Sequence, residues 1–195
     1  MCSRFYTDKE IAEQILQMAG SSAEDLKLTD GGNVLPSQQA LILSGREPGF
    51  YAETVAWGFP RFDGKGLLIN ARAETAPAKK TFRDSVLERR CVIPARHFYE
   101  WDKEKNKFAF RYGDQRPLFM AGFYKQFEEG DRFIVITTEA GDSVRPVHDR
   151  MPLILPEEQL KDWIYDQDAA MEMLMQPSPL LERFQEEEQQ KISLI

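Results

Sequence analysis

The sequence predicts an α+β fold, a single domain in which a largely antiparallel, barrel-like β-sheet is flanked by a few helices. Short runs rich in aromatic and β-branched residues recur through the middle of the chain, and clusters of Gly, Asp, Asn and Pro separate them. Helical patterns occur near both ends and at one interruption between the runs. With 195 residues, 42% of them hydrophobic, the chain can bury one substantial core.

The first predicted element is a helix over residues 8–19. Thr7 and Glu10 form a capping-box pattern, the apolar residues that follow recur at helical spacing, and Gly20 supplies a C-terminal stop. Six predicted strands follow it, over residues 40–44, 51–57, 66–70, 107–112, 117–124 and 132–138.

A helical stretch over residues 78–90 interrupts these strands and precedes a further strand that begins at Cys91. After Pro156 the pattern becomes helical again. We therefore expect residues 1–155 to form the main unit, and residues 156–195 to form a helical, acidic C-terminal extension packed on it or trailing from it.

The net charge of −7 is unevenly distributed. Residues 156–195 hold ten Asp and Glu against three Lys and Arg, which leaves 22 of each in residues 1–155. DNA-binding domains are usually basic, but a neutral body can carry a local basic groove, so composition neither supports nor excludes a DNA partner. The stretch EEEQQK, residues 186–191, is typical of a solvated helix face or a frayed tail.

The two cysteines, Cys2 and Cys91, have no paired spacing and no accompanying Cys/His cluster, so we expect neither a disulfide framework nor a metal site. Cys91 is expected to be a buried apolar group. The first twenty residues are polar and charged, and no apolar run approaches the roughly 18 residues of a membrane span. We expect a cytoplasmic protein with no membrane partner.

Cys2 is the residue with the most distinctive chemistry. A small second residue permits removal of Met1, which would make Cys2 the amino terminus. An α-amine with a pKa of about 7.7–8.0 and a thiol with a pKa of about 8.5 would then occupy adjacent carbons. The amine can form a Schiff base with an aldehyde, and the thiol can add to the same carbon to close a thiazolidine ring. On this residue alone, a cysteine without function remains the alternative.

Four further stretches place chemically capable residues beside aromatics or proline, as functional loops and strand ends do. They are WGFP (57–60), NARAET (70–75), FYEW (98–101) and VHDRMP (147–152). Taken singly, each is weak. Glu100 also fits the outward residue of an alternating strand, and His148 also fits a structural salt-bridge loop.

Together, and in this order after MCSRF, these stretches resemble the SRAP family, the SOS response-associated peptidases or abasic-site processing proteins. The similarity covers most of residues 2–155 and includes NVLP, RRCVIPARHFYEW, PLFMAGFY and FIVITTEA. It implies a protein that crosslinks to an abasic site in single-stranded DNA, often at a junction with duplex, through its amino-terminal cysteine, and so shields the lesion. It implies no cofactor; we expect a monomer that associates with the nucleoid when bound to DNA.

The resemblance also implies roles for four residues. Cys2 would be the covalent nucleophile and Asn70 would orient it by hydrogen bonding. Glu100 would act as acid and base near the amine, and His148 would assist sugar ring opening, proton transfers and phosphate contact. The residue types suit these roles, because histidine titrates near neutrality, a partly buried carboxylate does so too, and asparagine offers a donor and an acceptor without charge.

DNA binding would fall first to Arg4 and Arg72, because guanidinium groups match phosphate oxygens. The path of the strand would be lined by Asn33, Pro36, Trp57 and Phe59. Aromatic faces stack on bases of any sequence, worth about 1–3 kcal/mol per base. Trp57 and Phe59 equally fit a hydrophobic core.

The sequence departs from the family pattern at three places. Ser3 stands where glycine is usual, glycine precedes Asn33 where an aromatic residue is usual, and residues 177–195 have no clear counterpart. Two other function classes stay open. One is a cysteine peptidase or autoproteolytic hydrolase that uses Cys2, and the other is a non-covalent single-stranded DNA-binding module in which the cysteine is incidental.

Overall fold

The computed structural model describes residues 2–20, 31–46 and 49–185. Its helices and strands, in chain order, are β1 (Phe5–Asp8), α1 (Lys9–Met18), β2 (Gly31–Val34), β3 (Gln39–Arg46), β4 (Gly49–Trp57), β5 (Phe59–Pro60), β6 (Leu67–Leu68), β7 (Asn70–Arg72), α2 (Arg83–Glu88), β8 (Arg90–Ala95), β9 (His97–Trp101), β10 (Lys107–Arg111), β11 (Leu118–Phe127), β12 (Gly130–Glu139), β13 (Arg150–Pro152), β14 (Ile154–Leu155), α3 (Leu160–Tyr165), α4 (Gln167–Met173) and β15 (Glu182–Phe184).

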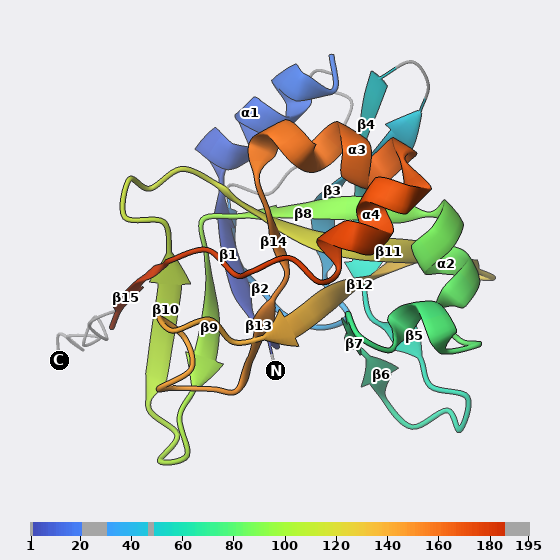
Figure 1. Ribbon diagram of the computed structural model, residues 1–195. Helices are drawn as coiled ribbons and strands as arrows, with labels where there is room; N and C mark the ends of the chain where they lie inside the picture. Colours follow the sequence, from blue (N-terminus) through green and yellow to red (C-terminus); the bar gives the residue numbers. More distant parts are fainter. Residues whose placement is uncertain (1, 21–30, 47–48, 186–195) are drawn as a thin grey trace, which may run out of the picture.

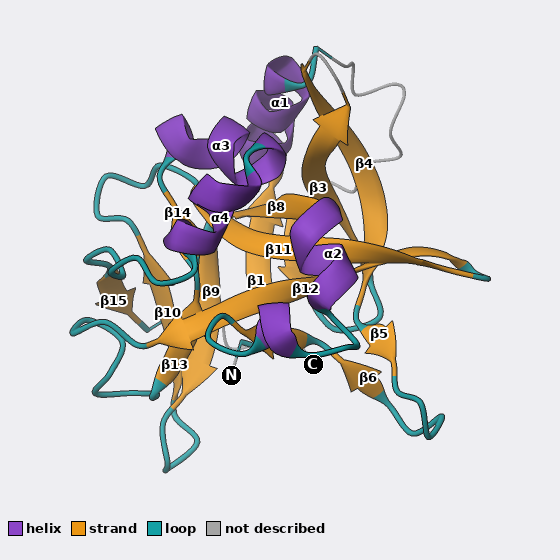
Figure 2. Cartoon of the chain, turned by 45° about the vertical axis from the view of Figure 1, so that its right-hand side comes forward, coloured by secondary structure: helices purple, strands orange, loops and turns teal. Residues whose placement is uncertain are grey.

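Five strands close into a barrel (Figures 1 and 2). The pairs β4–β3, β3–β8, β8–β11 and β11–β12 are antiparallel, and a short parallel pairing of β12 with β4 completes the ring. β13 and β7 extend this sheet from β12, and β14 extends it from β11. The predicted α+β class and the barrel-like, largely antiparallel sheet are confirmed.

A second sheet has the order β15-β10-β9-β1-β2 and is antiparallel throughout. Its buried face joins alternate residues of the barrel strands in one hydrophobic cluster, in which the Phe5 ring lies 5.2 Å from the Trp57 ring. The other alternate barrel residues form a second cluster with the apolar faces of α1, α3 and α4 (Figure 1). The two-residue period of the strands therefore gives the barrel two packed faces.

The predicted helix over residues 8–19 is confirmed as α1, but its cap is Asp8 and not Thr7. The Asp8 side chain accepts a hydrogen bond from the Ile11 N–H at 3.0 Å, and Gly20 beyond the helix has a φ of +63°. Thr7 instead pairs with Gly32 as part of β1. The strand therefore runs into the helix, and the cap lies one residue later than the pattern predicts.

Two other predicted elements differ in extent from the elements that the structure contains. The stretch 66–70 forms β6, which pairs with β5, and the start of β7, which pairs with β12. The helical stretch 78–90 narrows to α2, because its last residue, Arg90, begins β8. The buried Arg90 guanidinium donates to main-chain carbonyls at the ends of α2 and α3, including that of Ile164 at 3.1 Å. Its N–H groups thus provide hydrogen bonds to carbonyl oxygens that have no partner within the last turn of a helix, and its positive charge is favourable at a helix C-terminus.

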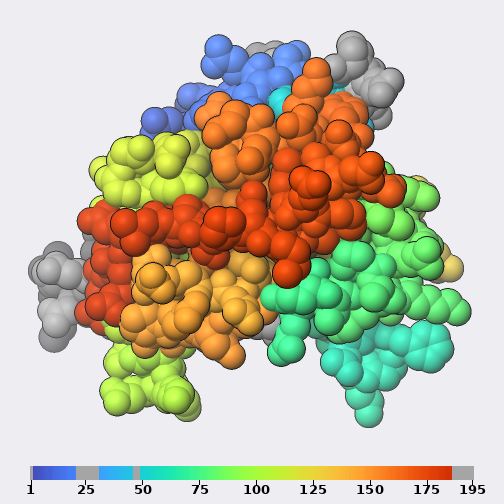
Figure 3. Space-filling model, in the orientation of Figure 1, coloured from blue at the N-terminus to red at the C-terminus, as the bar shows by residue number. Residues whose placement is uncertain are grey.

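The C-terminal part contributes to both clusters. Leu160 and Trp163 of α3 are fully buried against the barrel, and Leu181 is buried in the cluster that contains Cys2. Figure 3 shows the chain after α4, in red, as a band between the yellow-green and orange parts of the surface. The boundary after residue 155 stays a prediction. Met1 and the acidic stretch 186–191 lie outside the described residues.

Within the described ranges, none of the helices is both long enough and apolar enough to cross a membrane.

Candidate active site

Strand pairing brings the beginning of the chain beside β9. Phe5 pairs with Phe98 and Tyr6 with His97, and the Tyr99 N–H donates to the carbonyl of Arg4 at 3.0 Å. The segment before Phe5 therefore runs alongside the end of β9 that carries Glu100. This register, together with burial of Phe5, brings Cys2 into the protein, where it is completely buried.

Asn70 holds the main chain of Cys2 by a hydrogen bond. Its side-chain Nδ2 donates to the Cys2 carbonyl oxygen at 2.7 Å, across 68 positions of sequence. Asn70 begins β7, which pairs in parallel with β12 at Val135. The preceding carbonyl, that of Ile69, accepts a hydrogen bond from the Trp57 indole N–H at 2.9 Å. Trp57 therefore anchors the chain directly before Asn70.

Glu100 is a buried carboxyl on β9, with 2% of its surface exposed. Along β9 the Glu100 side chain points to the opposite face of the strand from that of Tyr99. Glu100 is paired with Phe108 of the neighbouring strand β10. Burial raises the pKa of Glu100 to about 7, because the charged form loses hydration. This carboxyl can therefore both give and take a proton near neutral pH.

His148 faces Glu100 from the loop before β13. Its Nε2 lies 4.0 Å from Glu100 Oε2, and the imidazole is a quarter exposed. On the other side of the ring, Nδ1 accepts a hydrogen bond from the Arg150 N–H at 3.0 Å and lies 3.1 Å from Asp149 Oδ1. Burial lowers the pKa of His148 below its usual 6.5. Glu100 and His148 thus face each other at a distance slightly longer than a hydrogen bond.

The Cys2 thiol is held in its neutral form. Burial raises its pKa far above the usual range, and the Glu100 charge acts in the same direction. Sγ donates to the Arg4 carbonyl oxygen at 3.6 Å. A neutral thiol is a weak nucleophile.

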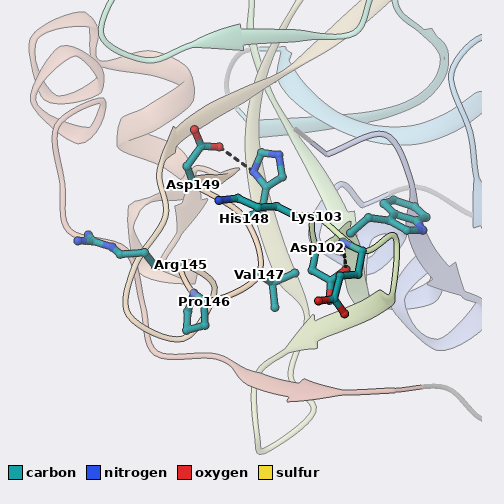
Figure 4. A pocket seen from close by; sticks show the side chains of 9 residues that line it. Asp102, Lys103, Arg145, Pro146, Val147, His148 and Asp149 are labelled. Carbon is teal, nitrogen blue, oxygen red and sulfur yellow. Dashed lines mark hydrogen bonds and ion pairs between the residues drawn. The ribbon is translucent and has the colours of Figure 1, made fainter.

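A cavity of about 870 Å³ opens beside His148 (Figure 4). The turn between β9 and β10, the loop over residues 145–149 and Trp101 line it, and the His148 and Asp149 side chains lie at its edge. A second hollow, of about 400 Å³, is lined by residues of both charges, Arg72, Arg145 and Arg150 together with Glu139 and Asp149, and by Ala140. The β5–β6 and β9–β10 hairpins project to the same side of the molecule, with the beginning of β1 between them (Figure 1).

A family model described as SOS response associated peptidase (SRAP) matches residues 1–192. The chain belongs to the SRAP family. The match includes the C-terminal segment for which the sequence offered no clear counterpart, so that reading was wrong. Leu181 of this segment is buried in the hydrophobic cluster that contains Cys2, so the segment takes part in the packing of this chain.

The chain is similar to three named or solved relatives. It is 29% identical to the abasic site processing protein YedK of Escherichia coli, over 88% of this chain and 83% of the relative. It is 31% identical to the abasic site processing protein YoqW of Bacillus subtilis, over 91% of this chain and 87% of the relative. A crystal structure of a Bacteroides thetaiotaomicron protein, 20% identical, has the same fold, with a TM-score of 0.80 over 94% of this chain and 91% of that one.

Within this SRAP fold, Cys2, Asn70, Glu100 and His148 lie together, although 146 positions of sequence separate the first from the last. Two residues expected to line a DNA strand lie elsewhere. Trp57 is 0% exposed, stacked on Phe133, and Phe59 is 1% exposed among other phenylalanines. The assignment of Trp57 and Phe59 to base stacking was therefore wrong, because both rings are buried in the hydrophobic core and cannot reach a base.

The other expected DNA contacts lie on or near the surface. Arg72 and Asn33 are exposed, and Pro36 is half-buried in the turn between β2 and β3. Arg4 is half-buried, with its guanidinium 5.6 Å from the Trp101 ring centre. Their contact with DNA stays a prediction.

Phe62, which no sequence motif singled out, is the most exposed large apolar side chain of the described residues. It lies in the loop between β5 and β6, next to Arg61 and close to Lys65. The signal was present, because an aromatic residue within a Gly-, Asp- and Lys-containing turn has no core to enter. The aromatic residues of the nearby WGFP motif, Trp57 and Phe59, were assigned to base stacking instead, and both are buried.

Proposed function

We propose that this protein captures abasic sites in single-stranded DNA by forming a covalent thiazolidine through Cys2, and thereby shields the lesion. The observation that carries the proposal is that Cys2 is held by Asn70 and lies within the electrostatic reach of Glu100, which in turn faces His148. The names of the two bacterial relatives, both abasic site processing proteins, support the substrate. The reactive form is the chain from which Met1 has been removed.

The order of bond formation follows from the state of the thiol. Because burial keeps the Cys2 thiol protonated, the α-amine attacks the sugar aldehyde first. The carbinolamine loses one water molecule to give an imine. The thiol then adds across the C=N bond, with sulfur on carbon and the proton on nitrogen. The ring therefore forms with net loss of one water.

Glu100 and His148 supply the proton transfers. Opening of the sugar hemiacetal takes a proton from the C1′ hydroxyl and gives one to the ring oxygen, and loss of water from the carbinolamine needs an acid. A carboxyl whose pKa is about 7 exists in both forms at neutral pH, so Glu100 can serve each step in turn. His148, whose Nε2 lies 4.0 Å from Glu100 Oε2, is the second group that can accept a proton on this side of the site.

Asn70 positions the nucleophile. Its Nδ2 holds the Cys2 carbonyl, and its buried Oδ1 accepts no hydrogen bond from the described residues. An amide acceptor in that position suits a terminal amine, because it accepts an N–H without protonating the nitrogen. Pre-positioning of this kind replaces a bimolecular search by a local reaction.

The DNA would pass over the face that carries the two hairpins. Arg72, at the rim of the hollow shared with Arg145 and Arg150, faces solvent and suits a phosphate. Phe62, on the β5–β6 hairpin, offers an aromatic surface for a base. Neither contact reads sequence, which suits a lesion that occurs anywhere.

A cysteine peptidase is the second candidate, and the state of the thiol disfavours it. Such enzymes activate their cysteine as a thiolate beside histidine. Here burial favours the neutral thiol, and Sγ donates to the Arg4 carbonyl oxygen.

The test is a denaturing gel of the mature protein mixed with single-stranded DNA that contains one abasic site. We expect a shifted band with the wild type and with Cys91→Ala, which removes the other, buried cysteine. Cys2→Ala retains the amine, so its band should appear only when borohydride reduces the imine. A band of wild-type strength from Cys2→Ala without borohydride would contradict the proposal, and no band with any protein would reject covalent capture altogether.

A further inference from the structure

Asp149 is an exposed carboxylate that none of the proposed steps uses. Its side chain is 88% exposed, yet Oδ1 turns back to lie 3.1 Å from His148 Nδ1 (Figure 4). The Arg150 N–H lies 3.0 Å from the same nitrogen. One ring nitrogen therefore meets both a donor and a charged acceptor.

The two contacts require opposite protonation of Nδ1. The Arg150 N–H can donate only to a bare Nδ1, which leaves the proton of the neutral ring on Nε2. The Asp149 carboxylate can only accept, so its contact requires a proton on Nδ1 and leaves Nε2 of the neutral ring bare. The Arg150 carbonyl oxygen, at 3.2 Å, is an uncharged acceptor for the same proton. Which partner prevails decides what Nε2 presents to Glu100.

We propose that Asp149 is a positioning residue that holds a proton on His148 Nδ1, so that Nε2 is free to take a proton from the Glu100 side of the site. The inference rests on the proposed function. In the resting neutral ring, the Arg150 N–H and the Asp149 carboxylate favour alternate tautomers. When Nε2 accepts a proton, Asp149 stabilises the resulting imidazolium by a charge-assisted hydrogen bond. The Arg150 N–H alone would leave His148 as a donor toward Glu100.

Other charged groups surround His148 and Asp149. From neighbouring elements they are Glu100 of β9, Asp102, Lys103 and Glu104 of the β9–β10 turn, Arg72 of β7, Glu139 of β12, and Arg145 and Arg150 beside Asp149 in the chain. The Asp102 carboxylate accepts a hydrogen bond from the Asn106 side chain of the same turn at 2.8 Å. The Arg150 guanidinium is paired with Glu74 at 2.7 Å. Asp149 is thus the carboxylate that meets Nδ1 directly.

The pKa directions agree with this geometry. Burial lowers the pKa of His148, and the Asp149 charge opposes that change. Burial raises the pKa of Glu100, and the same charge adds to the rise. Removal of the charge should therefore lower the pKa of both groups, and the pH dependence of adduct formation should move to lower pH.

The test uses Asp149→Asn, which preserves shape, with Asp142→Asn in the same loop as the matched control. Asp142 is exposed and lines a different hollow. The chain has only two histidines, so nitrogen-15 NMR of the DNA-free mature protein can follow the His148 ring directly. We expect Asp149→Asn to shift the tautomer population toward Nε2–H and to move the His148 titration to lower pH.

In the crosslinking assay we expect the same variant to slow adduct formation at neutral pH by about two- to fivefold, the factor that corresponds to an exposed ion pair of up to about 1 kcal/mol. Unchanged NMR titration and an unchanged rate profile would overturn the role of Asp149 and leave covalent capture standing. Absence of any wild-type adduct would reject the proposed function instead, while the NMR result would still report on Asp149.

Discussion

Replacement of Glu100 by glutamine should stabilise the protein in a pH-dependent way. Glu100 has an ordinary pKa of 4.5, and burial raises it to about 7 in the folded chain. Between these values the folded protein keeps a proton that the unfolded chain releases, so stability falls as pH rises from 4.5 and the full cost is present above 7. At about 1.4 kcal/mol per pH unit, that cost is about 3 kcal/mol.

Glutamine resembles the protonated carboxyl and does not titrate. We therefore expect Glu100→Gln to raise the free energy of unfolding by about 3 kcal/mol at pH 8.5 and by less than about 1 kcal/mol at pH 5. Urea titrations at both pH values measure this difference, and Glu104→Gln in the exposed β9–β10 turn is the control. The same variant should lose most of its crosslinking. An equal effect on stability at both pH values would refute the reasoning.

Three further predictions concern binding and positioning. Arg72→Ala should weaken binding to single-stranded DNA and flatten its salt dependence, because one phosphate contact is lost; an unchanged slope in a fluorescence titration would contradict this. Phe62→Ala should weaken binding by about 1–3 kcal/mol without changing thermal stability, whereas Phe62→Trp should retain it, and equal affinity of all three proteins would exclude stacking there. Asn70→Ala should slow crosslinking by about 10- to 100-fold at unchanged DNA affinity, since the Cys2 carbonyl loses its donor; a wild-type rate in a quenched time course would show that Asn70 does not position it.

Local sequence patterns predicted the positions of the long strands and of the first helix well, because these elements have a clear periodicity of their own. The strand runs of β3, β4, β10, β11 and β12 and the periodicity of α1 fall close to their predicted places. Short elements whose partners are distant in sequence escaped prediction. β1 is held between β2 and β9, and β15 pairs with the edge of β10, which lies about 70 positions earlier in the sequence. No local pattern reports such a partner.

The site shows the same division. Residue types and motif order identified Cys2, Asn70, Glu100 and His148, because their chemistry is unusual at those positions. Aromatic rings were harder to assign, because a tryptophan at a strand end fits a core as well as a surface. Trp57 turned inward to anchor the residue before Asn70, and Phe62 turned outward. Burial is a tertiary property, and the sequence near these rings does not determine it.

The central claim is that nitrogen and sulfur of Cys2 bond to one carbon of the lesion. Intact mass spectrometry of the wild-type adduct tests this most directly. The account predicts the mass of the chain from Cys2 onward plus that of the DNA strand, less one water, and a peptide map that places the DNA on Cys2. An adduct on any other residue, or one formed while Met1 is still present, would contradict it.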